Sequence, residues 1–218
     1  MDDIVKKAMA KWPNVPHCYG WLALDARGAW RMRDERAQHL NLAGDKVTQT
    51  ALLGFINRNY AVDERGCWYF QNGPQRVFLN LEATPFIART DPQHGLVLQT
   101  GEPVATLSQV LLTDQGEFIV VAGDGAEAGA AGAAPGATRK VAQVDDRDAV
   151  QLMAWLRMND APVSDEQLMA WLNNGAGELT LTYRDQRVTV ERIAAADVAR
   201  HFKFERLPQP APTDAAVS

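Results

Sequence analysis

Apolar and polar residues alternate over short stretches along most of the chain, and tight-turn signals separate these stretches. One phrase recurs: apolar residues run into an Asp, a Gly follows two or three positions later, and an aromatic residue begins the next stretch. It spans Leu22–Trp30 and Tyr60–Trp68 and, in a looser form, Leu111–Phe118. Gly supplies the positive φ of a tight turn and Asp hydrogen-bonds its own backbone there, so the phrase predicts three antiparallel hairpins. Residues 178–191 alternate on both arms of a polar turn and predict a fourth.

Helical spacing appears in three other places. Residues 47–57 place Leu and Phe at helical intervals, and the hexapeptide Gln-Leu-Met-Ala-Trp-Leu occurs at 151–156 and again at 167–172. The second copy has a complete helix start, with Ser164 as N-cap and Gln167 completing a capping box. We therefore expect one helix between the first two hairpins and a later pair of helices packed on a sheet.

The order of these elements predicts an α+β fold made of two small, related domains, each built from antiparallel hairpins with packed helices. Residues 76–81 form a further strand of the first sheet, and residues 85–89 are expected to extend that sheet. The predicted domains are 1–93 and 94–207. The Gly/Ala-rich segment 123–138 is interpreted as a flexible insertion at a hairpin tip, and the Pro/Ala-rich residues 208–218 as a disordered tail.

The composition is that of an ordinary globular protein, with 46% hydrophobic and 22% charged residues among 218. Residues 1–93 carry 12 Lys/Arg against 10 Asp/Glu, and residues 94–218 carry 10 against 17. This balance argues against generic nucleic-acid binding, which needs a strongly basic face. The apolar stretches are far shorter than the ~18 residues of a membrane span, and no signal-peptide pattern opens the chain, so we expect a cytoplasmic protein.

No cofactor or metal motif is present. The Gly-rich segment follows a strand but lacks the amphipathic helix of a dinucleotide-binding fingerprint, and no Walker loop follows it. Cys18 and Cys67 are interpreted as reduced, mostly buried thiols, although His17 beside Cys18 leaves open a reactive thiol or a metal ligand. No catalytic signature is found, so the sequence predicts no cofactor and favours a protein that is not an enzyme.

Two alternatives to a binding role stay open. Three acids in residues 145–148 precede a helix and either cap it or bind a divalent cation. Together with His17 they could instead serve a hydrolase or transferase acting on a nucleotide-like substrate. An exposed edge strand, in turn, would suit an oligomeric scaffold. The oligomeric state itself does not follow from the sequence.

The arginines supply the strongest indication of a ligand. Arg31 and Arg33 alternate along one predicted strand, so their guanidinium groups share a face, and Arg36 follows closely. If Arg58, Arg76 or Arg89 also reaches this face, the arginines form a fork-shaped site for phosphate or carboxylate. Otherwise they are solvated and paired with the neighbouring Asp34 and Glu35. In the first case, replacing Arg31 and Arg33 by Ala is expected to weaken anion binding and to leave the thermal midpoint nearly unchanged.

Aromatic and amide residues concentrate in two segments, 13–21 and 68–74. Such a combination holds a flat ligand such as a nucleobase, or else packs a hairpin core. We take Trp68 as the ring contact. Arg31, Arg33, Arg76 and Trp68 are the candidate site residues, with a small anionic or nucleotide-like ligand, or a protein, as the expected partner.

The run 11–34, with residues 55–60 and 68–76, resembles uncharacterised proteobacterial proteins of about this length. The broader layout of helix, turn-bearing hairpin and valine-rich strand is similar to a second family of unknown function. That resemblance implies a duplicated α+β core, a C-terminal domain like a pleckstrin-homology fold, and a signalling-related ligand site near the interface between domains. It implies no catalytic residues. The sequence thus favours a ligand-sensing or protein-interaction module.

Overall fold

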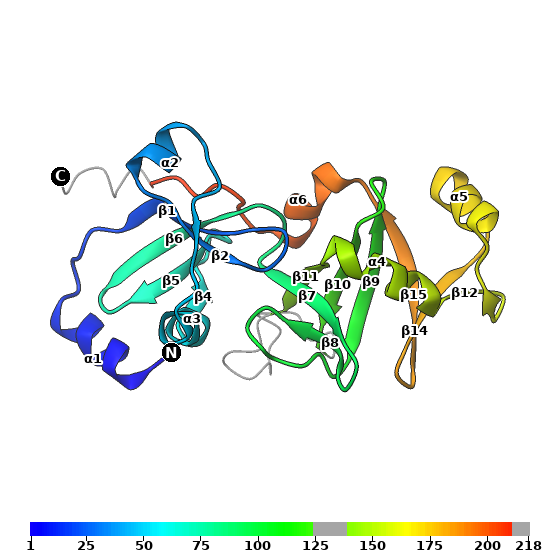
Figure 1. Ribbon diagram of the computed structural model, residues 1–218, viewed down its shortest axis with the longest axis horizontal. Coiled ribbons are helices and arrows are strands. Elements are labelled where there is room, and N and C mark those ends of the chain that lie inside the picture. Colours follow the sequence, from blue (N-terminus) through cyan, green and yellow to red (C-terminus); the bar gives the residue numbers. More distant parts are fainter. Residues whose placement is uncertain (124–138, 211–218) are drawn as a thin grey trace. The chain divides into compact units, whose positions relative to one another are not determined.

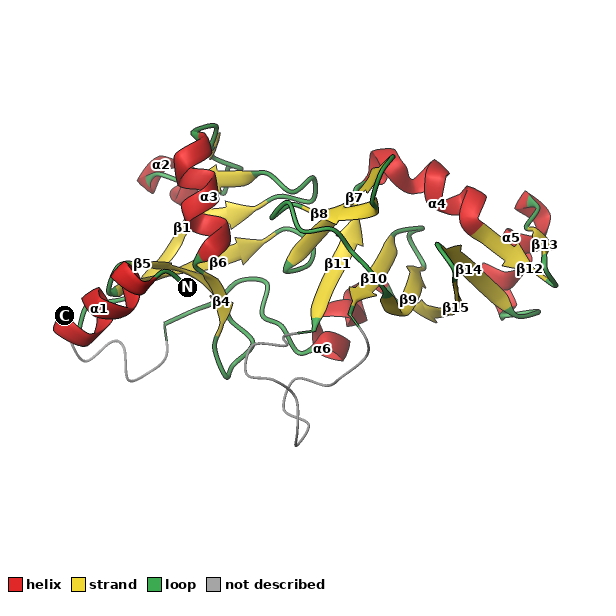
Figure 2. Cartoon of the chain, turned by 90° about the horizontal axis from the view of Figure 1, so that it is seen from below, coloured by secondary structure: helices red, strands yellow, loops and turns green. Residues whose placement is uncertain are grey.

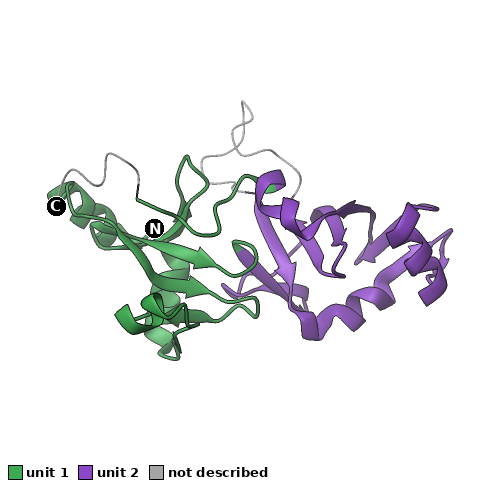
Figure 3. Ribbon diagram, turned by 90° about the horizontal axis from the view of Figure 1, so that it is seen from above, with its two compact units in different colours: residues 1–85, 202–218 green, residues 86–201 purple. Residues whose placement is uncertain are grey.

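The computed structural model of the chain describes residues 1–123 and 139–210. The described residues form two compact units, and each contains a sheet and helices (Figure 3), which confirms the α+β class. Unit 1 comprises residues 1–85 and the segment from Phe202 onward, and unit 2 comprises residues 86–201. The division falls at Pro85, upstream of the boundary expected near residue 93, and the chain returns to unit 1 at its end.

Unit 1 is built on a six-stranded sheet with the order β3-β2-β1-β6-β5-β4. The central pair, β1 and β6, is parallel, and the other neighbours are antiparallel. The strands are β1 (Cys18–Leu24), β2 (Trp30–Met32), β3 (Asp45–Lys46), β4 (Tyr60–Val62), β5 (Trp68–Asn72) and β6 (Gln75–Leu81). The helices are α1 (Asp3–Lys11), α2 (Glu35–His39) and α3 (Thr50–Arg58).

The turns that join β1 to β2 and β4 to β5 have the same hydrogen bonds. In each, the Asp Oδ1 (Asp25 or Asp63) accepts the backbone N–H groups of the residues two and four positions later, at 2.8 to 3.0 Å. Gly28 and Gly66 follow with φ of 77° and 78°. Both Asp residues therefore act on their own backbone, as the sequence predicted.

Helix α3 covers one face of the unit 1 sheet (Figure 2). The ring of Tyr60 lies 5.2 Å from that of Trp30 and 4.7 Å from that of Trp68, and Phe55 of α3 meets Phe70 edge-on at 5.3 Å. Trp30, Trp68 and Phe70 are buried. This aromatic layer is the core of unit 1, because each large ring removes much apolar area from water.

The end of the chain completes unit 1. The segment lies where β5 begins and β6 ends. The N–H of Glu205 donates to the carbonyl of Gly66 at 3.0 Å, and the N–H of Leu81 donates to the carbonyl of Arg206 at 2.8 Å. Phe204 is buried. Residues 202–207, expected in the second domain, thus pair with strands of the first unit.

Unit 2 contains a nine-stranded sheet with the order β13-β12-β14-β15-β9-β10-β11-β7-β8. The strands are β7 (Phe86–Asp91), β8 (Gly95–Leu98), β9 (Leu107–Thr113), β10 (Phe118–Ala122), β11 (Lys140–Val144), β12 (Leu156–Met158), β13 (Ala161–Pro162), β14 (Leu179–Tyr183) and β15 (Gln186–Ile193). The helices are α4 (Ala149–Trp155), α5 (Asp165–Asn174) and α6 (Val198–Phe202), with 3₁₀ turns η1 (Asp146–Asp148) and η2 (Ala195–Asp197). Residues 85–89 are expected to extend the first sheet, but β7 begins at Phe86, and residues 86–88 pair in parallel with β11.

The turn between β9 and β10 differs from the two in unit 1. The hydroxyl of Thr113 accepts the N–H groups of Gln115 and Glu117, at 3.2 and 3.0 Å. Asp114 instead accepts the N–H of Ala195 at 2.8 Å, at the start of η2. The prediction that Asp114 serves its own turn is therefore wrong, because the threonine before it already supplies the acceptor.

The unit 2 sheet bends so that strands far apart in its order meet. The hydroxyl of Tyr183, at the end of β14, donates to the carbonyl of Val104 at 2.7 Å and accepts the N–H of Leu96 in β8 at 3.0 Å. Tyr183 is almost fully buried. Its single hydroxyl therefore ties β14 to the other edge of the sheet.

The two hexapeptide copies form α4 and α5 (Figure 1), as predicted. Ser164 and Gln167 make the predicted capping box at the start of α5. The helices are not a simple pair, because the first copy ends its helix at Trp155 and the chain then forms β12 and β13 before α5 begins. Leu152 and Leu168, at equivalent positions, are both buried.

Most of the predicted insertion 123–138 and of the predicted tail 208–218 lies outside the described residues. In the ranges that are described, no helix is both long and apolar enough to cross a membrane.

Candidate functional site

Arg33 is a buried structural residue. Its side chain is 6% exposed and donates to the carbonyls of Leu42 at 3.0 Å and Ala37 at 3.3 Å, and to Oδ1 of Asn41 at 3.3 Å. These bonds hold the loop that follows α2. Arg33 therefore does not share an open face with Arg31, because it lies past the end of β2 where the chain turns into α2.

The other two arginines of the predicted cluster are also separated. The Nε of Arg31 donates to Oδ2 of Asp25 at 2.8 Å, so this arginine is paired, although with a partner other than the expected Asp34 and Glu35. Asp34 instead caps α2. Arg36 is exposed and lines a pocket of about 380 Å³ beside Met32 and the loop after α2.

Trp68 and Arg76 lie on opposite faces of the unit 1 sheet. Arg76 is the register partner of Gln71, three residues after Trp68, and side chains alternate between the faces of a strand. Trp68 therefore belongs to the core face, under Tyr60. Arg31 pairs with Ala23, and Ala23 pairs with Asn80. Asn80 lies four residues after Arg76 on β6, so Arg31 and Arg76 share a face.

Three polar side chains form a row across the face that carries Arg76, and we call His17, Arg76 and Gln71 the polar row. Gln71 pairs with Arg76 across β5 and β6. Cys18 pairs with Val77 in the parallel strands β1 and β6, so the preceding residue, His17, lies beside Arg76. His17 and Gln71 therefore flank Arg76 from opposite sides. The chain thus brings together two of the segments in which the sequence concentrates aromatics and amides.

A row of aromatic rings lies next to the polar row. Tyr19 stacks on Phe78 with ring centroids 4.7 Å apart and planes 9° from parallel, and Tyr69 meets Phe78 at 5.6 Å. The Arg76 guanidinium lies 4.7 Å from the centroid of Tyr69, and that of Arg65 lies 5.4 Å from Phe78. Two cations therefore lie over the rings of one sheet face, as cation–π contacts favour.

Each member of the polar row has hydrogen-bonding capacity left over. Gln71 is fully buried, and its Nε2 donates to the Gly73 carbonyl at 2.9 Å, while its Oε1 accepts nothing in the described part of the chain. The buried Nδ1 of His17 also lacks a hydrogen-bond partner there. Arg76, partly buried, makes its ring contact with Tyr69 but no hydrogen bond or ion pair within the described ranges. Buried polar atoms are nearly always satisfied in folded proteins, so such a cluster needs an explanation.

Neither thiol belongs to a reactive site. Cys67 packs with Tyr69 and Phe78, and burial raises its pKa to about 11. Burial also raises the pKa of Cys18. A thiol whose pKa is raised is mostly protonated at neutral pH and is a poor nucleophile or metal ligand. No three His, Cys, Asp or Glu side chains gather as a metal site would require, among the residues that the structure describes.

Two of the three acids before α4, Asp145 and Asp148, serve structure. Asp145 is almost fully buried, and its carboxylate accepts the backbone N–H and the Nε of Arg147 at 3.1 and 2.9 Å. Arg89 also contacts it at 3.2 Å. Asp148 accepts the N–H of Thr90 at 2.8 Å. The hydrogen bonds from Arg147 hold the pKa of Asp145 well below its usual range, so this group is no proton donor at neutral pH.

Comparison with known proteins gives a family but no activity. No curated protein matches the chain. The crystal structure of a DUF1285 family protein from Silicibacter pomeroyi DSS-3 aligns with 92% of this chain and 100% of that chain, at 13% sequence identity and a TM-score of 0.42. The DUF2944 family model, described as "Protein of unknown function (DUF2946)", matches residues 1–209. The chain therefore belongs to this family of proteins of unknown function.

Proposed function

We propose that unit 1 is a ligand-sensing module that binds a small anionic ligand across the polar row. The observation that carries the proposal is the buried, unsatisfied Oε1 of Gln71 beside a guanidinium that has no ion pair in the described part of the chain. A buried acceptor without a donor costs about 1–3 kcal/mol. A ligand that supplies the donor recovers this free energy on binding.

The three groups define the chemistry of the ligand. Arg76 requires an anion, for which a guanidinium offers several parallel N–H donors. Gln71 Oε1 requires an N–H or O–H donor, and His17 Nδ1 accepts or donates according to its tautomer. The ligand is therefore a phosphate or carboxylate that also carries a donor, and a nucleotide-like molecule meets both conditions.

The setting of Arg76 favours an anion. The side chain is half-buried, where charges interact more strongly than in bulk water. Its contact with Tyr69 holds the guanidinium plane at the sheet face. A guanidinium that is held in this way loses little side-chain entropy when an anion binds.

A thermal-shift screen against mononucleotides, sugar phosphates and organic acids tests the proposal. A ligand at 100 times its dissociation constant stabilises the fold by ~2.7 kcal/mol. The best anion is then titrated calorimetrically into the wild type, Arg76→Gln and Arg36→Gln. Because Arg76→Gln loses a charge-assisted hydrogen bond, we expect it to bind the anion at least about tenfold more weakly than the wild type.

Arg36→Gln is the matched control, because it removes an exposed arginine of the same unit at a separate pocket. It is expected to bind the anion like the wild type. If Arg36→Gln loses binding and Arg76→Gln keeps it, the site is the pocket beside α2 and the polar row is the wrong assignment.

The duplicated core and the signalling role that the resemblance implies are also proposals. A duplicated core gains support from one feature that the three turns share: a side-chain oxygen of Asp25, Asp63 or Thr113 accepts the N–H groups two and four residues later, although the acceptor in unit 2 is a threonine hydroxyl. The pleckstrin-homology likeness of the C-terminal unit, a signalling role, cytoplasmic location and a protein partner remain predictions from the sequence. The hydrolase or transferase and the oligomeric scaffold gain no specific observation in their favour.

A further inference from the structure

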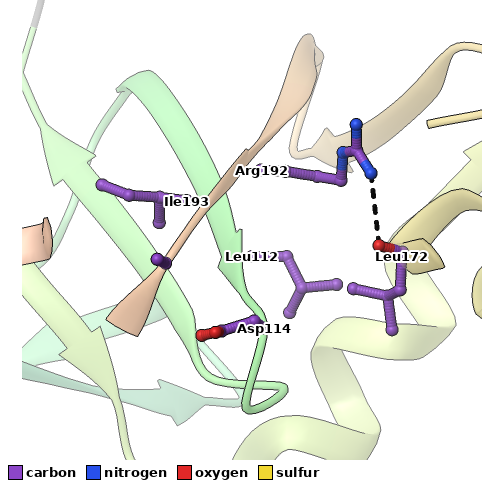
Figure 4. Close-up of a pocket in the computed structure, with 6 residues that line it drawn as sticks. Leu112, Asp114, Leu172, Arg192 and Ile193 are labelled. Carbon is purple, nitrogen blue, oxygen red and sulfur yellow. Dashed lines mark hydrogen bonds between the residues drawn. The ribbon is translucent and has the colours of Figure 1, made fainter. Parts of the chain in front are cut away.

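A second candidate site, separate from the polar row, lies in unit 2 where two parallel strands end. β9 and β15 run parallel and finish at Thr113 and Ile193. A pocket of about 250 Å³ opens beside these ends, below the ~300 Å³ at which sites for drug-sized ligands begin. Its lining residues, drawn in Figure 4, are Leu112, Asp114, Leu172, Arg192, Ile193 and Ala194.

One part of the pocket is apolar. Leu112 of β9 is the register partner of Arg192, so the stem of the arginine runs beside it. Leu172, in the last turn of α5, lies across from Leu112 (Figure 4). Leu112 and Leu172 form a surface that suits a short aliphatic group, because its burial gains about 0.8 kcal/mol per methylene.

Arg192 supplies the polar part of the pocket, and only one of its guanidinium nitrogens, Nη1, donates hydrogen bonds within the described part of the chain. Its Nη1 donates to the carbonyls of Leu172 at 3.2 Å and Trp171 at 3.4 Å, at the C-terminal end of α5. In the described part of the chain, Nε and Nη2 have no hydrogen-bond acceptor. These two N–H groups form the edge of a guanidinium that matches both oxygens of a carboxylate.

Gly175 packs against the face of the Arg192 guanidinium. A Cβ atom at this position would lie 2.7 Å from Nη2 of Arg192, 3.1 Å from Cζ and 3.5 Å from Nε. The residue is also the left-handed C-cap of α5, with φ of 73°. A glycine at this position therefore both ends the helix and lets the chain approach the guanidinium closely, which helps to hold Arg192 in place.

Asp114 limits the charge of the ligand. Its Oδ1 accepts the N–H of Ala195 at 2.8 Å, and Figure 4 shows its carboxylate on the other side of Leu112 from Arg192. No ion pair joins the two residues in the described ranges. A negative charge at this rim disfavours a ligand with more than one anionic group.

We propose that this pocket binds a small aliphatic monocarboxylate, with its carboxylate on the Nε–Nη2 edge of Arg192 and its alkyl group against Leu112 and Leu172. The site goes beyond the proposed function of unit 1, because it uses different residues in a different unit. Loss of binding at one site therefore leaves the test of the other intact.

Titration of the ¹⁵N-labelled full chain with isocaproate, followed by amide chemical shifts, tests the proposal. Isocaproamide removes the charge, acetate removes the alkyl group, and succinate adds a second carboxylate. We expect saturable shifts confined to residues 112–114, 172–175 and 192–195 for isocaproate, and at least about tenfold weaker binding of the other three probes. Equal binding of the amide, or no saturable shift with isocaproate, overturns the proposal.

Two substitutions locate the contact. Arg192→Gln is expected to weaken isocaproate binding about tenfold or more, whereas Arg187→Gln, on the same strand, leaves it unchanged. Arg192→Lys keeps the charge but loses the paired N–H edge, so intermediate affinity is expected. Wild-type affinity in Arg192→Gln contradicts the assignment, and the amide spectrum of each variant shows whether it is folded.

Discussion

A Cβ atom on Gly66 would lie 2.2 Å from the carbonyl oxygen of Lys203. Gly66 ends the turn between β4 and β5 with φ of 78°, and its carbonyl accepts the N–H of Glu205. One glycine thus gives the turn its backbone conformation and gives the C-terminal segment room to pair with unit 1. The close approach ties the end of the chain to a turn far away in the sequence.

Gly66→Ala should destabilise unit 1 by more than Gly73→Ala. Both glycines have positive φ, which costs about 1–2 kcal/mol for an L-residue, but a methyl group on Gly73 would meet no atom within 4 Å. The extra cost at Gly66 comes from displacing residues 203–205. Urea unfolding gives both free energies, and equal losses would show that the segment does not pack on this turn.

Arg33→Met should lower the free energy of unfolding by about 2–4 kcal/mol, because the Leu42 carbonyl and Oδ1 of Asn41 lose the donor that Arg33 supplies. Arg31→Met should cost about 1 kcal/mol or less, since its pair with Asp25 is partly exposed. The sequence alone predicts instead that replacing both arginines leaves the thermal midpoint nearly unchanged. A drop of only a few tenths of a kcal/mol in Arg33→Met would favour that interpretation.

The stability of unit 2 should depend on pH through Asp145. Its folded-state pKa is lowered by Arg147, so the stabilisation is complete above the unfolded pKa of ~3.9 and is lost as the pH falls through the folded value. Asp145→Asn should therefore destabilise at pH 7, and its difference from the wild type should shrink below about pH 4. Asp185→Asn, at an exposed turn position, is the control. A constant difference across this range would mean that the charge of Asp145 is irrelevant.

The two thiols should react at different rates. Burial raises the pKa of Cys67 to about 11, so modification by a disulfide reagent at pH 8 should be slow in the folded protein and should become fast in urea. Cys18 is only partly buried and should react sooner. Rates for Cys18→Ser and Cys67→Ser separate the two contributions. Rapid folded-state reaction in Cys18→Ser would contradict the burial of Cys67.

Local signals explain what could be predicted from the sequence. The turns at Asp25 and Asp63 and the capping box at Ser164 each depend on residues a few positions apart, and all three are confirmed. The prediction for Asp114 is wrong because Thr113 offers an equivalent acceptor one residue before it. Nothing in the Asp-Gly spacing distinguishes these two choices.

Strand register explains what could not be predicted. The sequence indicates Arg76 and the aromatic segments, but whether Trp68 or Gln71 shares the face of Arg76 depends on pairing between β5 and β6. The sequence places Arg33 on a strand face because the alternating pattern continues through it, whereas β2 ends at Met32. The return of residues 202–207 to unit 1 has no local signal at all.

Calorimetric titration of Gln71→Met with the best anion tests the central claim most directly. The substitution removes a buried acceptor that has no donor in the described part of the chain, but it also removes the hydrogen bond from Nε2 to the Gly73 carbonyl. These two effects oppose each other, so the free energy of unfolding should change by about 1 kcal/mol or less. The affinity should nevertheless fall about tenfold, because the ligand loses its hydrogen bond to Oε1. Unchanged affinity in a folded Gln71→Met protein would contradict binding at the polar row.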